Sequence, residues 1–307
     1  MRFRNAILFV GLAVAWGSAF TAIKAGLEFF PPVLFAAFRY DLAGVLMLGY
    51  AAYVTDRWIP RSRNEWVLVG ISGTLMIAAY HVFLFTGEQG TTSAAAAIIV
   101  SLSPILTTGF ARALLPDERL TFIGIVGLLV GFAGVVILSN PDPDNLLTTR
   151  TVSMFLIFVA AAAFALGSVL TRRVDAELPV ETMEAWSMLI GAVLMHGASI
   201  AIAESVSDVQ WTGEAILALL YLVVVASALG FLIYFDLLNR LGPIEINLVS
   251  YAAPVVAAVT GLLFLSETPT VYTVVGFVLI LSGFVLLKRE ALRSEVTKLR
   301  IYRESGD

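Results

Sequence analysis

The sequence predicts an all-α integral membrane protein with ten transmembrane helices. Apolar residues make up 59% of the 307 residues and charged residues only 14%, whereas soluble domains hold about 45–50% and roughly 25%. Mean hydropathy is +0.91. The apolar residues gather in stretches of about 20 residues, and a helix of that length crosses the hydrocarbon core of a bilayer. The stretches are rich in Gly, Ala and Leu and do not alternate with polar residues, which argues against a β-barrel.

The expected helices follow one another with short connections, so no separate soluble domain fits between them. The first five are expected at 6–27, 33–54, 66–87, 91–114 and 120–139. The other five are expected at 151–171, 181–203, 213–236, 244–265 and 270–288. The first stretch also has the basic start and apolar run of a signal peptide, but its counterpart later in the chain favours a permanent helix.

The distribution of Lys and Arg sets the orientation in the membrane, because cytoplasmic loops carry an excess of basic residues. With a cytoplasmic amino terminus, every Lys and Arg except Lys24, Arg39 and Arg150 falls on the cytoplasmic side. This predicts a multi-pass protein of the cell (cytoplasmic) membrane with both termini in the cytoplasm. Residues 290–307 are expected to form a charged cytoplasmic tail.

The second half of the chain repeats the first at an offset near 150 residues. Ala-Trp-Gly-Ser at 15–18 matches Ala-Leu-Gly-Ser at 165–168, and Pro104 matches Pro254. Two five-helix repeats, 1–140 and 151–289, must insert upside down relative to each other because five is an odd number of crossings. Inverted repeats of this kind are the architecture of secondary transporters, which bind cargo near the bilayer midplane. The expected mechanism is alternating access to a central cavity.

These residues resemble the EamA-type family of the drug/metabolite transporter superfamily. The resemblance runs from Ala6 to about Arg289. It rests on the Ala-Trp-Gly-Ser segment, Phe38-Arg39, the two repeated prolines, and turns at Glu118 and Glu267 that each precede a Gly-rich span. The resemblance implies a polytopic carrier, often an exporter of amino acids or other small metabolites.

Ionisable residues inside a membrane span are costly, and Arg39 and Asp41 are therefore candidate functional residues. At about 100° per residue they point to roughly opposite faces of one helix. Arg39 is predicted to bind an anionic group such as a carboxylate in the central cavity; the alternative is a structural pair with another helix. Asp41 and His81 are the candidate proton-coupling groups, and buried hydrogen bonds between helices are the alternative for both.

The repeated prolines suggest kinks that permit gate movement. Each removes a helical hydrogen bond, which would leave the carbonyls of Val100 and Ser250 open. Some polar residues near these prolines, and some aromatic residues in the middle of other spans, are expected to contact the substrate. The alternative is that they only pack helices together. These residues are Trp16, Tyr80, Ser101, Asn247 and Tyr251.

The remaining ionisable residues have simpler interpretations. Glu184, in the seventh span, is either a gate or coupling group or extends to the cytoplasmic surface. His196 has no matching acid in the sequence and is assigned to packing. Lys24 and Glu28 are expected to pair at positions i and i+4, and Glu267 to cap a helix.

Several classes of protein find no support in the sequence. The chain has no Cys and only two His, so no metal site, disulfide or other cofactor is expected. No basic patch suggests nucleic acid, no phosphate-binding loop occurs, and no acid cluster or nucleophile–base pair suggests an enzyme. The expected partners are a small-molecule substrate and the lipid bilayer. A homodimer through small-residue faces is left open.

The function predicted from the sequence is secondary active transport of a small metabolite, an amino acid first, exported by proton exchange. A carrier of drugs, nucleotide sugars or other metabolites is the alternative within the superfamily. A facilitative, channel-like membrane protein is the alternative outside it.

Overall fold

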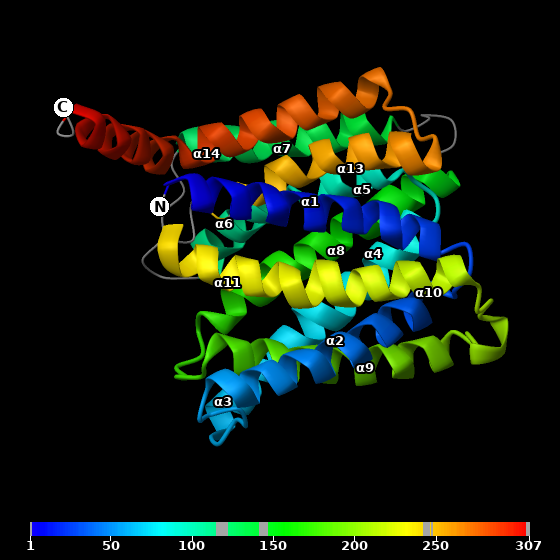
Figure 1. Ribbon diagram of the computed structural model, residues 1–307. Helices are drawn as coiled ribbons and strands as arrows, with labels where there is room; N and C mark the ends of the chain where they lie inside the picture. Colours follow the sequence, from blue (N-terminus) through cyan, green and yellow to red (C-terminus); the bar gives the residue numbers. More distant parts are fainter. Residues whose placement is uncertain (1, 115–121, 141–146, 242–245, 247, 305–307) are drawn as a thin grey trace.

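The computed structural model describes residues 2–114, 122–140, 147–241, 246 and 248–304, and in this part of the chain the regular structure is helical throughout. Within these residues, eight helices are long and apolar enough to cross a membrane, and there are two shorter apolar helices, Val249–Leu265 and Val271–Leu287. The helices lie side by side in one bundle (Figure 1). The predicted all-helical membrane protein is confirmed.

The first half of the chain contains five consecutive apolar segments. They are α1 (Arg2–Gly26), α2 (Pro32–Val54), a third formed by α3 (Arg63–Ile71), η1 (Ser72–Ala79) and α4 (Tyr80–Glu88), a fourth formed by α5 (Ser93–Val100) and α6 (Ser103–Leu114), and α7 (Phe122–Ser139).

The second half follows the same order. Its elements are α8 (Thr149–Thr171), α9 (Val180–Ala201), the short η2 (Val206–Asp208), α10 (Gly213–Leu220), η3 (Tyr221–Leu229), α11 (Gly230–Leu241), α13 (Val249–Leu265) and α14 (Val271–Glu304). The last helix extends beyond the bundle at its carboxyl end (Figure 1), where the sequence predicts the charged tail.

Local sequence signals explain where several helices begin. The hydroxyl groups of Ser62, Thr92, Thr148 and Thr212 each accept a hydrogen bond from a backbone N–H three residues later. A hydroxyl in this position pairs one of the N–H groups that the first turn of a helix leaves open.

Two segments of π-helix interrupt the bundle at equivalent places in the two halves. η1 begins at Ser72 and η3 begins at Tyr221, each in the middle of the third apolar segment of its half. π-Helical turns are rare and often mark functional sites, because the wider turn changes the direction of side chains. Hydrophobic periodicity does not distinguish such a segment from an ordinary helix, so the sequence does not indicate either π-helix.

The main contacts between the two halves are symmetric: each that a segment of the first half makes has an equivalent made by the matching segment of the second half. α7 packs against α14, and α2 packs against α9, so equivalent segments meet each other. α1 packs against α13 just as α8 packs against α6. Small residues permit the closest of these contacts: a Cβ added at Gly283 would lie 2.6 Å from the carbonyl oxygen of Gly127.

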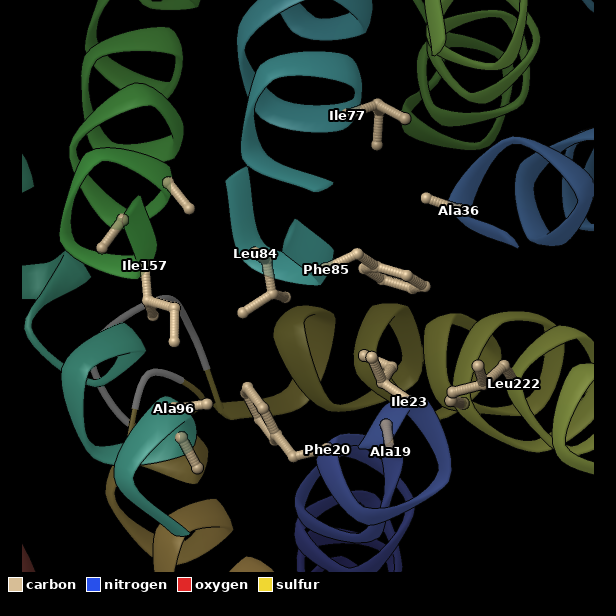
Figure 2. Close-up of a cluster of buried hydrophobic side chains, with 14 of the residues drawn as sticks. Ala19, Phe20, Ile23, Ala36, Ile77, Leu84, Phe85, Ala96, Ile157 and Leu222 are labelled. Carbon is tan, nitrogen blue, oxygen red and sulfur yellow. The ribbon is translucent and has the colours of Figure 1, made fainter. Parts of the chain in front are cut away.

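Buried apolar side chains from seven elements meet inside the bundle. Figure 2 shows them converging from α1, α2, η1, α4, α5, α8 and η3. We call this set the hydrophobic layer; its members, all buried, are Ala19, Phe20, Ile23, Ala36, Ile77, Leu84, Phe85, Ala96, Ile157 and Leu222.

Candidate functional site

Arg39 lies in the interior of the bundle on α2, where its side chain reaches across to η3. The residue is only 7% exposed. Its Nε donates a hydrogen bond of 3.3 Å to Oγ of Ser227, and its guanidinium carbon lies 5.1 Å from the centre of the Tyr40 ring. No described residue accepts a hydrogen bond from its two terminal amino groups. These donors are therefore available to a ligand.

His81 is held between two helices by both of its ring nitrogens. Nδ1 lies 2.7 Å from the carbonyl oxygen of Ile77, and Nε2 lies 2.7 Å from the hydroxyl oxygen of Tyr40. A carbonyl can only accept, so Nδ1 carries a proton, and when the ring is neutral Nε2 accepts a hydrogen bond from Tyr40. The ring of Tyr80 packs 4.5 Å from His81 and 5.5 Å from Phe164 of α8.

Trp16 attaches α1 to the same π-helical segment that Arg39 contacts. Its Nε1 donates a hydrogen bond of 3.1 Å to the carbonyl oxygen of Ala226. Its ring lies 5.4 Å from that of Tyr234 and 6.0 Å from that of Phe231. Two candidate residues from different helices thus hold consecutive residues of η3, at positions 226 and 227.

Glu184 of α9 is half-buried and faces this group of residues. It lies within electrostatic range of Tyr40 and Tyr234. The described residues offer its carboxylate no hydrogen bond and no ion pair. We call the whole set the central cluster; it comprises Trp16, Arg39, Tyr40, Tyr80, His81, Phe164, Glu184, Ser227, Phe231 and Tyr234.

The central cluster and the hydrophobic layer occupy successive depths of the bundle. Along α1, Trp16 is followed by the layer residues Ala19 to Ile23; along α4, His81 is followed by Leu84 and Phe85. Apart from Ile77, which precedes His81 by one turn, the layer residues lie between the central cluster and the end of the bundle where α1 and α4 finish, which we call the distal end. The amino terminus lies at the opposite end (Figure 1).

Asp41 and His196 lie apart from the central cluster and contact each other. Oδ2 of Asp41 is 2.7 Å from Nε2 of His196, joining α2 to α9. The sequence assigned His196 to packing for want of an acid, and this was wrong. Spacing along one helix could not find the partner, because it lies 155 positions away in the sequence.

Two further candidate residues are buried in contacts with protein. Ser101 is 0% exposed, and its hydroxyl donates to the carbonyl oxygen of Ile98 at 2.6 Å. The ring of Tyr251 packs 4.3 Å from that of Phe284 on α14. Asn247 and Glu118 lie outside the described residues.

The two prolines sit differently in their helices. At Pro104 the fourth segment is interrupted, since α5 ends at Val100 and α6 begins at Ser103. The carbonyl of Val100, which the sequence predicted to be open, accepts a 2.7 Å hydrogen bond from Oγ of Ser103. Pro254 lies inside the continuous helix α13 and is buried.

Nowhere in the described residues do three or more His, Cys, Asp or Glu side chains group closely enough to hold a metal ion. What the site offers instead is one buried cation, one half-buried carboxylate and aromatic walls. A multi-pass helical bundle with such a polar cluster in its interior is organised as a membrane transporter is.

Comparison with known proteins identifies the family. The model of the EamA-like transporter family matches residues 4–140 and again residues 151–289. The chain therefore belongs to the EamA-like transporter family, within the drug/metabolite transporter superfamily.

Several relatives are named as transporters. The uncharacterized transporter YvbV of Bacillus subtilis is 26% identical over 97% of this chain and 96% of its own length. The uncharacterized inner membrane transporter YedA of Escherichia coli K12 is 28% identical over 85% and 84%. The chloroplastic WAT1-related protein At3g02690 of Arabidopsis thaliana is 26% identical, with 89% of this chain and 66% of its own covered.

A solved crystal structure has the same fold. Its TM-score is 0.65, with 23% sequence identity and coverage of 95% of this chain and 99% of the other. The fold and the family together make this chain a multi-pass membrane transporter.

Proposed function

We propose that this chain is a secondary active transporter that works by alternating access and exports a small metabolite, an amino acid first, across the cytoplasmic membrane in exchange for protons. The observation that carries this proposal is Arg39: a guanidinium inside the bundle with one nitrogen held by Ser227 and two amino groups that find no acceptor among the described residues.

An anionic cargo would pair with the buried positive charge of Arg39. Arginine remains charged under all physiological conditions, and a buried charge costs free energy unless it is paired. A carboxylate accepts two parallel hydrogen bonds from a guanidinium, which is the strongest common arrangement for that pair. The carboxylate of an amino acid would therefore bind at the terminal amino groups of Arg39.

The rest of the central cluster suits a zwitterion with an amphipathic side chain. The carboxylate of Glu184 is the group that would attract the cargo's ammonium, while Trp16 and Tyr80 offer aromatic faces and hydrogen-bonding edges. Ser101, Asn247 and Tyr251 stay proposed contacts for other stages of the transport cycle.

Alternating access in this proposal uses two inverted five-helix repeats, residues 1–140 and 151–289, with both termini and the tail at 290–307 in the cytoplasm. The twofold match of the family model, the paired packing of the halves and the equivalent positions of η1 and η3 support it. The hydrophobic layer would then close the outer half, so that the structure corresponds to an inward-facing conformation. Pro104 and Pro254 are proposed hinge points for the opposite conformation.

Proton exchange requires a group that changes charge during the cycle. His81 and Glu184 belong to the central cluster, where the charge of the cargo would act on them directly. Asp41, hydrogen-bonded to His196, is the third candidate. All three are proposed carriers, to be separated by substitution.

Transport assays in proteoliposomes test the proposal. We expect saturable uptake of at least one amino acid from a panel, faster under an imposed pH gradient, and no uptake with Arg39→Ala. Arg39→Lys keeps the charge but loses the paired hydrogen bonds, worth about 1.5–3 kcal/mol, and should raise KM roughly 10- to 100-fold. Arg63→Ala, an exposed arginine distant from the cluster, is the control. Unchanged flux in Arg39→Ala would make that residue structural and overturn the proposed binding mode.

One observation favours a second cargo class. Trp16, Phe231 and Tyr234 form a contiguous aromatic wall, which suits amphipathic, drug-like compounds. If no amino acid in the panel is transported, saturable and Trp16-dependent flux of an aromatic drug-like compound would identify this alternative.

A further inference from the structure

Glu88, the last residue of α4, is buried without a partner. It is 0% exposed, and neither of its carboxylate oxygens has a hydrogen-bonding partner in the described part of the chain. The hydroxyl of Ser93, at the start of α5, is also fully buried and unpartnered. An ionised carboxylate in such surroundings costs much more free energy than a neutral carboxyl group. This geometry therefore fits the protonated side chain.

Lys24, the cation with the largest electrostatic effect on Glu88, forms its hydrogen bonds elsewhere. Nζ of Lys24 donates hydrogen bonds to the backbone carbonyl oxygens of Glu88, at 2.9 Å, and Gln89, at 2.8 Å. The sequence predicted that Lys24 would pair with Glu28, and the structure shows these two carbonyl contacts instead. Lys24 is near enough to act electrostatically on the carboxylate of Glu88, yet it forms no ion pair with it.

Glu267, an acid that acts electrostatically on Glu88, also forms its hydrogen bonds with another group. The two carboxylate oxygens of Glu267 accept hydrogen bonds of 3.2 and 2.9 Å from the backbone N–H of Ser93. Glu267 therefore caps α5 from the far half of the chain, and its negative charge faces Glu88 across the distal end. That charge further disfavours ionisation of Glu88 while the end is closed.

Other charged and titratable groups face Glu88 from the surrounding helices. Besides Lys24 of α1 and Glu267, which follows α13, they are Arg39 of α2 and Tyr80 of α4. Arg150 of α8 lines a cavity of about 420 Å³ together with Lys24, Glu267 and the residues that follow Glu88. Glu88 itself does not line this cavity, but Gln89, which directly follows it, does.

We propose that Glu88 is a proton-binding site coupled to the distal gate: it holds a proton while the hydrophobic layer is closed and loses that proton when the distal end opens. This inference rests on the alternating access of the proposed function. On opening, the carboxyl O–H bond breaks, the proton passes to water in the cavity, and the resulting carboxylate is stabilised by water and by the ammonium of Lys24.

The position of Glu88 explains why opening and deprotonation are linked. Phe85 and Leu84 of the hydrophobic layer precede it by one turn of α4, and Lys24 directly follows Ile23 of the layer. Separating the layer moves both helix ends that enclose the carboxyl group. Deprotonation without opening would leave a buried carboxylate that has no partner, whereas opening exposes the carboxyl group to water, in which a carboxylate is readily solvated.

Thiol accessibility measures this coupling, since the natural chain has no Cys. A reporter variant carries Ala96→Cys, in the hydrophobic layer, and is labelled in nanodiscs with a water-soluble maleimide between pH 5 and 9. The rate is divided by that of Ser207→Cys, an exposed position, to remove the intrinsic pH dependence of thiols. Each reporter is combined with Glu88→Gln, Glu88→Asp and, as matched control, the exposed acid variant Glu28→Gln.

If opening releases one proton, the normalised labelling rate should rise with pH by up to tenfold per pH unit. Glu88→Gln should label slowly at every pH, whereas Glu88→Asp and Glu28→Gln should keep the pH dependence. A normalised rate that is flat with pH in the natural background overturns the proposal, as does an unchanged pH dependence in Glu88→Gln. Because natural chain, Asp and Gln variants are compared, misfolding of one variant leaves the test intact.

Two controls separate this inference from neighbouring ones. A rate that responds to Na⁺ at constant pH, and not to pH, would assign Glu88 to a metal cation and overturn the proton site. The labelling assay contains no cargo, so pH-dependent labelling together with absent amino-acid flux would support the proton site while the proposed cargo fails.

Discussion

Nε2 of His196 lies 2.7 Å from Oδ2 of Asp41, and this contact joins α9 to α2 at the seam between the two halves of the chain. The two side chains are 35% and 42% exposed, so the pair sits at the periphery of the bundle and not within the central cluster. Phe38 packs against the imidazole from α2, at 5.9 Å between ring centres. A hydrogen bond between two polar side chains therefore joins α2 to α9, and an aromatic ring packs beside it.

We expect the Asp41–His196 contact to contribute about 1 kcal/mol of coupling between the two helices, the usual scale for hydrogen bonds between helices in a membrane. A double-mutant cycle of Asp41→Ala, His196→Ala and both together, followed by unfolding in mixed micelles, measures it. Strictly additive losses of unfolding free energy would show that the contact contributes nothing.

Trp16→Phe should lower both stability and transport. The change keeps an aromatic ring but removes the Nε1 donor, so the carbonyl of Ala226 in η3 loses its partner; the expected loss of unfolding free energy is about 1 kcal/mol. Trp211→Phe, at a residue that is 55% exposed, is the matched control. Equal melting temperatures for the two variants would contradict a structural role of the indole N–H.

Ser103→Ala should destabilise the interruption at Pro104. Without its hydroxyl the carbonyl of Val100 is left unpaired in the interior, at a cost of about 1–3 kcal/mol. Ser139 makes the same type of contact, to the carbonyl of Val136 at 2.9 Å, but at an exposed site. Ser139→Ala should change the melting temperature little, and an equal loss in both variants would refute the argument.

Gly283→Ala should separate α14 from α7. The added methyl group would lie 2.6 Å from the carbonyl oxygen of Gly127, which is too close for any carbon, and overpacking of this kind costs about 1–3 kcal/mol. At Gly49 a Cβ meets nothing within 4 Å, and Gly49→Ala should leave stability unchanged or raise it. Thermal unfolding in detergent compares the two; a stable Gly283→Ala variant would mean that the helix pair can move apart freely.

Much of the helical framework could be predicted from the sequence, because a bilayer admits few alternatives to long apolar helices. The residues Trp16, Arg39, Tyr80, His81 and Glu184 stood out for the same reason: polar or aromatic groups in the middle of an apolar span need an explanation. The structure brings these five together in one cluster. Their transport roles stay predictions that the flux and substitution experiments test.

What the sequence could not supply was the rotation and neighbourhood of each helix. The partner of His196, the contact of Arg39 with Ser227 and the enclosure of Glu88 all depend on which faces meet across distant segments. Glu88 in particular stands at the end of a predicted span, where an acid is ordinarily solvated, so nothing in the local sequence marks it as buried. For Lys24 the local sequence was misleading in the opposite way. Its i,i+4 spacing to Glu28 predicted an ion pair, but its ammonium donates hydrogen bonds to the carbonyl oxygens of Glu88 and Gln89 instead.

The matching π-helical segments carry a consequence for the ancestry of the molecule. Each contains wide turns that are rare in proteins, and they begin at Ser72 and Tyr221, equivalent points of two halves that the same family model matches. Two independent insertions at one and the same point are a less economical history than a single one. One origin of the wide turn, in a unit that was later repeated, accounts for both π-helical segments with a single event.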